Sequence, residues 1–164
     1  MSGWTIPHRG EVEVLIDASS EQAYAVLSDV TRVAEWSHEC RNAEWLDGAI
    51  GPQLGARFRG RNWAARFAWT RVCTITELVP GRRFAYLTGG GLGDSTRWTF
   101  DLAAEGSRTR VRQSFEAVRF PRALELFVFA FIPAHRDRRD TLRADLVRLG
   151  EVAAGRRPPS VAIA

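Results

Sequence analysis

Residues 95–118, STRWTFDLAAEGSRTRVRQSFEAV, decide the fold. Two runs of alternating apolar and polar residues flank the turn signal Glu105-Gly106. Side chains of a β-strand point alternately to opposite faces, so this pattern is typical of strands with one buried and one exposed face. The first run would bury Trp98, Phe100 and Leu102 opposite polar residues that include Arg97, whereas arginines at 108, 110 and 112 fill the outer positions of the second run. The stretch predicts an antiparallel hairpin with an aromatic inner face and an arginine-rich outer face.

Further strand patterns precede this hairpin along the chain. The segments between them are short and rich in glycine and proline, which leaves no room for the crossover helices of parallel strands. An N-terminal strand at residues 11–17 carries Val12, Val14 and Ile16 on one face. We therefore expect about seven consecutive antiparallel strands, at residues 11–17, 41–46, 57–63, 67–78, 82–88, 95–102 and 109–118.

One strand, at residues 67–78, has an ambiguous pattern. Alternation places the apolar Trp69 and Ile75 on the same face as the charged Arg71 and Glu77. We expect Trp69 and Ile75 to face inward, because large apolar side chains are usually buried.

Helix signals lie on both sides of the strand-rich region. Ser19-x-x-Gln22 has the spacing of a capping box, and a second short helix is expected over residues 30–36. After Phe120-Pro121, apolar residues recur at helical spacing through most of the remaining chain. This spacing predicts one long C-terminal helix, kinked at Pro133 because proline lacks the N–H that the helix needs.

The composition is that of one globular domain, which we expect to span residues 1–155 and to be followed by a loose tail at 156–164. The chain has 164 residues, 45% hydrophobic and 26% charged. All 23 basic residues are arginine, but 19 acidic residues reduce the formal net charge to +4. We interpret the arginine content as compositional bias and expect no nucleic-acid partner.

Other sequence signals are few. Cys40 and Cys73 have no metal-ligand spacing, so we expect neither a metal nor a cofactor. The N-terminus does not resemble a signal peptide, and no apolar run reaches the ~20 residues of a membrane span. We therefore expect a cytoplasmic protein without integral membrane association.

The aromatic content predicts a cavity. Six Trp, nine Phe and two Tyr supply a wide inner surface, which one long helix covers incompletely. Polar groups expected inside are Asn62, Gln113, the Tyr86 hydroxyl and, if the last helix stays in phase, His135; their convergence in an apolar space suits a bound ligand. The candidate ligand-binding residues are Trp36, Phe58, Asn62, Trp69, Tyr86, Trp98, Gln113, Phe115, Phe127, Phe131 and His135.

This order of elements resembles the helix-grip fold of the START-like (SRPBCC) superfamily. The segments DVTRVAEWSHEC (29–40), GARFRGRNW (55–63), PGRRFAY (80–86) and TRWTFDL (96–102) are similar to those of polyketide cyclase/dehydrase-like members. The resemblance covers roughly residues 10–153. It implies an α+β fold, in which a seven-stranded curved antiparallel sheet wraps around a long C-terminal helix, with two short helices after the first strand.

The resemblance also implies a hydrophobic cavity gated by the two short helices and nearby loops. It supplies no catalytic residues, because only structural segments match. His38 departs from the family pattern, which has proline there, and this places a titratable group near the expected cavity mouth.

Three functional hypotheses follow. The first is binding of a small hydrophobic or aromatic ligand, lipid or polyketide-like, in the cavity. The alternative is an aromatic polyketide cyclase/dehydratase-like enzyme, in which His135, Tyr86 or Asn62 assists enolisation and ring closure. The third is an interaction module acting through the outer arginines, although a solvated, charge-balanced surface is the simpler interpretation. Whether the protein forms a homodimer is left open.

Overall fold

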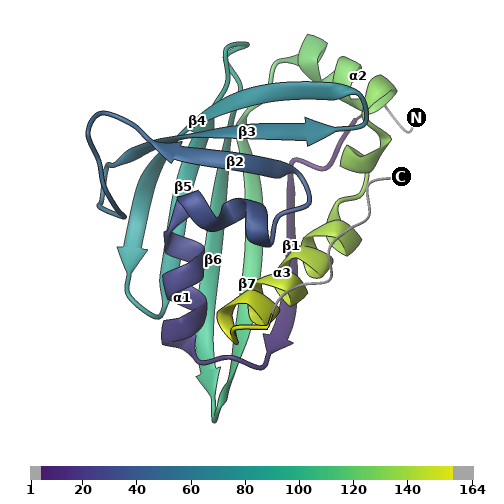
Figure 1. The fold of residues 1–164 in the computed structure, drawn as a ribbon. Helices are drawn as coiled ribbons and strands as arrows, with labels where there is room; N and C mark the ends of the chain where they lie inside the picture. Colours follow the sequence, from purple (N-terminus) through teal and green to yellow (C-terminus); the bar gives the residue numbers. More distant parts are fainter. Residues whose placement is uncertain (1–4, 157–164) are drawn as a thin grey trace.

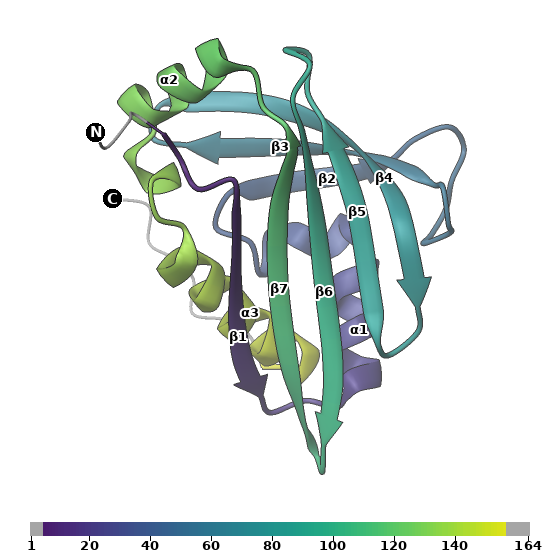
Figure 2. The same cartoon turned by 180° about the vertical axis from the view of Figure 1, so that it is seen from behind.

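The computed structural model describes residues 5–156, and its centre is one antiparallel seven-stranded sheet (Figure 1). The strand order is β1-β7-β6-β5-β4-β3-β2, so the first two strands of the chain, β1 and β2, form the two edges. Figure 2 shows β1, β7, β6 and β5 side by side from behind. The strands are β1 (Arg9–Ile16), β2 (Cys40–Trp45), β3 (Arg57–Ala64), β4 (Phe67–Val79), β5 (Arg83–Gly89), β6 (Ser95–Glu105) and β7 (Arg108–Arg119).

The expected helix-grip α+β fold is thus confirmed. The predicted hairpin is β6–β7, whose turn residue Gly106 has φ +64°, a conformation that favours glycine. The inner face of this hairpin buries Phe100, Leu102 and Val111 in the core, as their alternation predicts. All but the first residue of the predicted tail lie outside the described residues.

Two short helices follow β1, as expected. Helix α1 (Ser20–Ser28) starts with the predicted capping box: the Gln22 N–H donates to Ser19 Oγ, and the Ser19 N–H donates to Gln22 Oε1. The second, η1 (Val30–Glu35), is a 3₁₀ helix capped by Asp29, whose Oδ1 accepts from the Thr31 N–H. Together they place Trp36 against the core.

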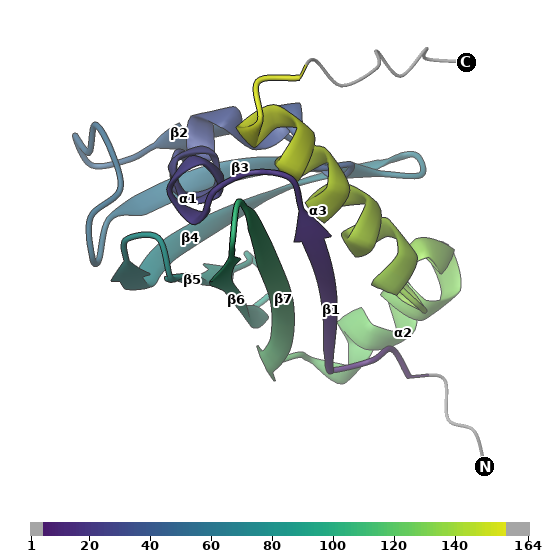
Figure 3. The same ribbon diagram turned by 90° about the horizontal axis from the view of Figure 1, so that it is seen from below.

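The prediction of one kinked C-terminal helix is wrong, because two separate α-helices follow β7 in this part of the chain. Helix α2 (Arg122–Phe131) is followed by Ile132, whose φ of −124° and ψ of 75° are not helical, and then by a 3₁₀ turn η2 (Pro133–His135). A residue before proline avoids the helical region, and proline cannot donate to the preceding turn. Helix α3 (Arg139–Ala153) then runs along the open side of the curved sheet (Figure 3).

Helix α3 packs very closely on β1. A Cβ atom at Gly150 would lie 2.7 Å from the Ile16 Cβ, so only glycine permits this approach. Leu142, Leu146 and Leu149 of α3 are buried in the core. The close contact fixes α3 against the sheet edge.

Strand β4 resolves the ambiguity of its sequence with a bulge. Ile75 is buried and Trp69 lies beside the interior, as expected, and Arg71 faces inward with them. The register then shifts between Ile75 and Glu77, which turns Glu77 outward, where its Oε2 lies 3.3 Å from Arg83 Nε. Strict alternation placed Glu77 on the inner face, and the extra residue of the bulge is the reason that it was wrong.

Carboxylates neutralise much of the arginine-rich outer face. Arg57 pairs with Asp47 at 2.9 Å, Arg59 with Glu44 at 3.1 Å, and Arg110 with Glu13 at 3.1 Å. This pairing fits a solvated, charge-balanced surface. Within residues 5–156, no helix has the length and apolar character needed to cross a membrane.

Candidate functional site

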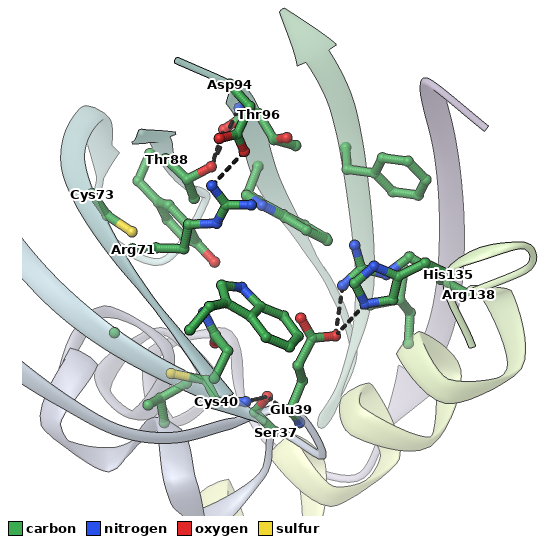
Figure 4. A pocket seen from close by; sticks show the side chains of 18 of the residues that line it. Ser37, Glu39, Cys40, Arg71, Cys73, Thr88, Asp94, Thr96, His135 and Arg138 are labelled. Atoms are coloured by element: carbon green, nitrogen blue, oxygen red, sulfur yellow. Dashed lines mark hydrogen bonds and ion pairs between the residues drawn. The ribbon is translucent and has the colours of Figure 1, made fainter. Parts of the chain in front are cut away.

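A cavity of about 380 Å³ lies between the concave face of the sheet and the helices (Figure 4). Its size falls within the range of small-molecule sites, which is about 300–1,000 Å³. Aromatic rings in edge-to-face contact form much of its wall: Trp36 on Phe100, with ring centroids 6.1 Å apart, and Phe58 on Tyr86, at 5.3 Å. Such contacts hold the rings in fixed orientations around an apolar space.

The structure places every predicted ligand-binding residue but one in the cavity wall. The exception is Phe131, which is 54% exposed and packs on Phe127 outside the wall. It was misplaced because α2 ends at this residue. The predicted residues that do line the cavity are Trp36, Phe58, Asn62, Trp69, Tyr86, Trp98, Gln113, Phe115, Phe127 and His135.

A buried carboxylate organises one side of the cavity. Glu39, immediately before β2, has its Oε2 3.2 Å from His135 Nε2 and 2.9 Å from Arg138 Nη2. Burial by itself would raise the pKa of Glu39, but the Arg138 charge and the hydrogen bond from His135 outweigh it and lower the pKa to about 2. Because an ionised carboxylate only accepts hydrogen bonds, His135 Nε2 carries the proton of this contact.

A second histidine–carboxylate contact lies beside the first. His38 Nδ1 is 2.6 Å from Asp145 Oδ2, and the His38 backbone N–H donates to Asp145 Oδ1 at 2.9 Å. Asp145 belongs to α3 and is buried, so the contact ties the loop between η1 and β2 to that helix. His38 Nε2 lies 3.9 Å from Glu39 Oε2, so the two contacts adjoin each other.

Another charged pair lies across the cavity from Glu39. Arg71 of β4 forms an ion pair with Asp94, in the turn before β6, and Asp94 is buried (Figure 4). Beside it, Thr88 Oγ1 donates to the Thr96 carbonyl at 3.2 Å. The apolar cavity therefore has a polar group of atoms on each of two sides.

Several buried polar atoms of the wall have no hydrogen-bond partner within residues 5–156. They comprise two donors and two acceptors: Trp36 Nε1, Arg138 Nε, Asp94 Oδ1 and Gln113 Oε1. Buried polar groups are normally paired, and an exception calls for a physical reason. A ligand with hydrogen-bonding groups would satisfy such atoms.

The cavity thiols are not suited to nucleophilic chemistry. Burial raises the pKa of Cys40 to about 11, and burial also raises the pKa of Cys73. Both thiols therefore stay protonated near neutral pH, whereas the thiolate is the reactive form. In the described part of the chain, no group of three or more His, Cys, Asp or Glu side chains is arranged to hold a metal ion.

The sequence did not identify the charged residues of the site. The carboxylate that contacts His135 belongs to Glu39, which lies just before β2 and far from His135 in the sequence. Arg71 was the exception, because alternation had placed it on the same face of its strand as Trp69, which was expected to point inward. The others come together only through tertiary contacts: Glu39, Asp94, Arg138 and Asp145.

Fold and site together define a helix-grip protein with an internal aromatic cavity. The chain belongs to the family described as "Polyketide cyclase / dehydrase and lipid transport", whose model matches residues 7–151. The resemblance seen in the sequence is thereby confirmed. A search of curated protein sequences finds no match.

Solved structures with the same fold come from several sources. TTHA0849 from Thermus thermophilus is 16% identical, with a TM-score of 0.71, and the match covers 90% of this chain and 97% of that one. CV1439 from Chromobacterium violaceum is also 16% identical, with a TM-score of 0.65, and the match covers 90% of this chain and 98% of CV1439. The di-domain ARO/CYC StfQ from the steffimycin biosynthetic pathway is 14% identical, with a TM-score of 0.69 over 93% of this chain and 51% of StfQ. At these identities the similarity shows the fold alone.

Proposed function

We propose that the protein binds a small hydrophobic or aromatic ligand, lipid or polyketide-like, in the cavity. The observation that carries this proposal is an aromatic-walled space of about 380 Å³, whose lining side chains include several with unpartnered buried polar atoms. Apolar walls with a few polar groups are typical of ligand sites, in which burial supplies affinity and hydrogen bonds fix orientation. The family description, which includes lipid transport, agrees with this function.

A dye-displacement experiment tests the proposal. We expect a polarity-sensitive fluorescent dye to bind one site per chain and to be displaced by lipids or polycyclic aromatic compounds. Native mass spectrometry of gently purified protein should show the same stoichiometry. If the folded protein takes up neither dye nor any competitor, ligand binding in the cavity is wrong.

The contact between His135 and Glu39 favours a second candidate, a polyketide cyclase/dehydratase-like enzyme. Glu39 would hold the His135 ring, which would accept a proton from an activated CH₂ group of a poly-β-ketone. Burial raises the pKa of Tyr86, so its hydroxyl stays neutral and would donate a hydrogen bond to the enolate oxygen. The Asn62 amide, also in the wall, would serve as a second donor.

Two substitutions distinguish the enzyme from the carrier. His135→Ala should lower turnover of a poly-β-ketone substrate by about 100-fold or more, and Tyr86→Phe should lower it by less, while dye affinity stays nearly unchanged. His8→Ala, which removes a histidine outside the cavity wall, is the matched control. A parallel fall of binding and turnover would contradict catalytic roles for these side chains.

The remaining expectations stay predictions. We infer one domain over residues 1–155, because the cavity wall draws on residues from Ile6, before β1, to Asp145 of α3. A cytoplasmic location and a homodimer are not tested by the fold or by the site.

A further inference from the structure

Helix α2 turns an apolar stripe toward solvent. Its exposed residues recur at spacings of three and four, which places them on one face of the helix. Leu126 and Phe127 are each 41% exposed and Phe131 is 54% exposed, whereas Glu125 and Val128 on the other side are buried. Contiguous exposed apolar surface of this kind marks an interaction site. The stripe consists of Ala123, Leu126, Phe127, Ala130 and Phe131.

The stripe borders the opening of the cavity. Phe127 belongs both to the stripe and to the cavity wall, and its ring lies 5.5 Å from that of Phe67 at the start of β4. Leu92, in the turn between β5 and β6, also lines the cavity and is 70% exposed. Figure 1 shows α2 at the end of the molecule where β3 turns into β4. We call the stripe together with Leu92 the docking face.

Arginines without carboxylate partners flank the docking face. Arg66 precedes Phe67, Arg119 ends β7 just before α2, and Arg136 follows α2. Arg136 donates to the Phe129 carbonyl at 2.8 Å, and its guanidinium lies 4.6 Å above the Phe129 ring. None of the three forms an ion pair with a carboxylate among residues 5–156, whereas several arginines of the outer sheet face, such as Arg57, Arg59 and Arg110, do.

Acidic groups near the docking face are already neutralised. Glu125 is the acidic residue of α2, and it is buried in contact with His8 and Arg122. Asp137, beyond η2, pairs with Arg139 at 2.8 Å. The docking face therefore combines an apolar centre with unpaired positive charge.

We propose that the docking face binds peripherally to a membrane surface that contains anionic lipids. Helix α2 lies in the plane of the interface, with Phe127 and Phe131 among the upper acyl chains and the arginines on headgroup phosphates. Docking places the cavity opening against the bilayer. A symmetric contact with a second copy is less favourable, because it would bring two sets of unpaired arginines into one interface without carboxylates to neutralise them.

Vesicle co-sedimentation tests the proposal. The full chain should sediment with vesicles of equimolar phosphatidylcholine and phosphatidylglycerol, much less with phosphatidylcholine alone, and less at high salt. Leu126→Glu or Phe131→Glu should weaken binding by roughly tenfold or more, because each places a charge in the apolar interface. The double variant Arg119→Gln, Arg136→Gln should reduce binding to the anionic vesicles.

The controls make equivalent changes away from the docking face. Ile50→Glu alters a residue that is 93% exposed in the loop between β2 and β3, and Arg57→Gln removes a paired arginine. Absence of sedimentation, or equal losses in these controls, would overturn the proposal. So would a dimer, detected by sedimentation velocity, that Leu126→Glu dissociates.

Membrane docking and ligand binding can fail separately. The docking proposal goes beyond the proposed function, and neither Leu126 nor Phe131 lines the cavity. Both variants should therefore keep the dye affinity of the parent protein. Loss of vesicle binding with dye binding intact supports the docking face, whereas simultaneous loss of both in the folded variants would contradict a docking face separate from the cavity.

Discussion

Replacing Glu39 by alanine is expected to lower the free energy of unfolding by about 3 kcal/mol at pH 7. The side chain is only 12% exposed, and its removal leaves Arg138 buried without its counter-charge and His135 without its hydrogen-bond acceptor. Urea denaturation followed by circular dichroism measures the loss. Glu39→Gln keeps the shape of the side chain but removes its charge, so it should be destabilising as well.

The pH dependence of stability gives an independent measure of the same contact. The pKa of Glu39 falls from its ordinary 4.5 to about 2 on folding, a difference equivalent to about 3 kcal/mol. Because the folded-state pKa is the lower one, this stabilisation is fully present above about pH 4.5. It is lost as the pH falls toward 2, so the parent and the alanine variant should converge over that interval.

A matched control is Glu44→Ala. Glu44 also pairs with an arginine, Arg59, but at the surface, where such a pair contributes about 0–1 kcal/mol. Equal losses for Glu39→Ala and Glu44→Ala would show that the buried contact adds no more stability than a surface pair. A constant difference between parent and Glu39→Ala down to pH 2 would show that the charge of Glu39 does not stabilise the fold.

Asn62→Trp should weaken ligand binding by roughly 10- to 100-fold. Asn62 faces the cavity from β3, and an indole ring there occupies space that the ligand would need. Overfilling a packed site costs about 1–3 kcal/mol, which corresponds to this range of affinity. Titration with the polarity-sensitive dye measures the change.

Arg61→Trp is the control for this substitution. It introduces the same ring one position earlier, where the strand points to the outer face, and Arg61 is exposed. We expect dye affinity to stay within about twofold of the parent. Unchanged binding in Asn62→Trp, when the protein is shown to be folded, would place the dye outside the cavity.

Most of the fold could be predicted because its signals are local. The capping box at Ser19 and Gln22 marks the start of α1, and alternation along β6 and β7 assigns each side chain to a face. The errors arose where a single residue changes the geometry. The bulge after Ile75 reverses the face of Glu77, and Pro133 separates two helices that share one apolar periodicity.

The charged part of the site could not be predicted for a different reason. Strand alternation places aromatic residues such as Phe58 and Trp98 on the inner face of the sheet, and they do line the cavity. Glu39 and Arg138 lie 99 positions apart, and Arg71 of β4 meets Asp94 in the turn before β6 although β5 lies between these two strands. Such pairs form only in the completed tertiary structure, and the residues next to each partner in the sequence give no sign of them.

The break between α2 and α3 means that packing restricts the residues of these two helices to different degrees. Helix α3 is restricted along its length, since Gly150 tolerates no side chain against Ile16 and its leucines fill the core. The exposed side of α2 carries no such packing requirement. Substitutions there can therefore change the surface of the molecule while the scaffold stays constant.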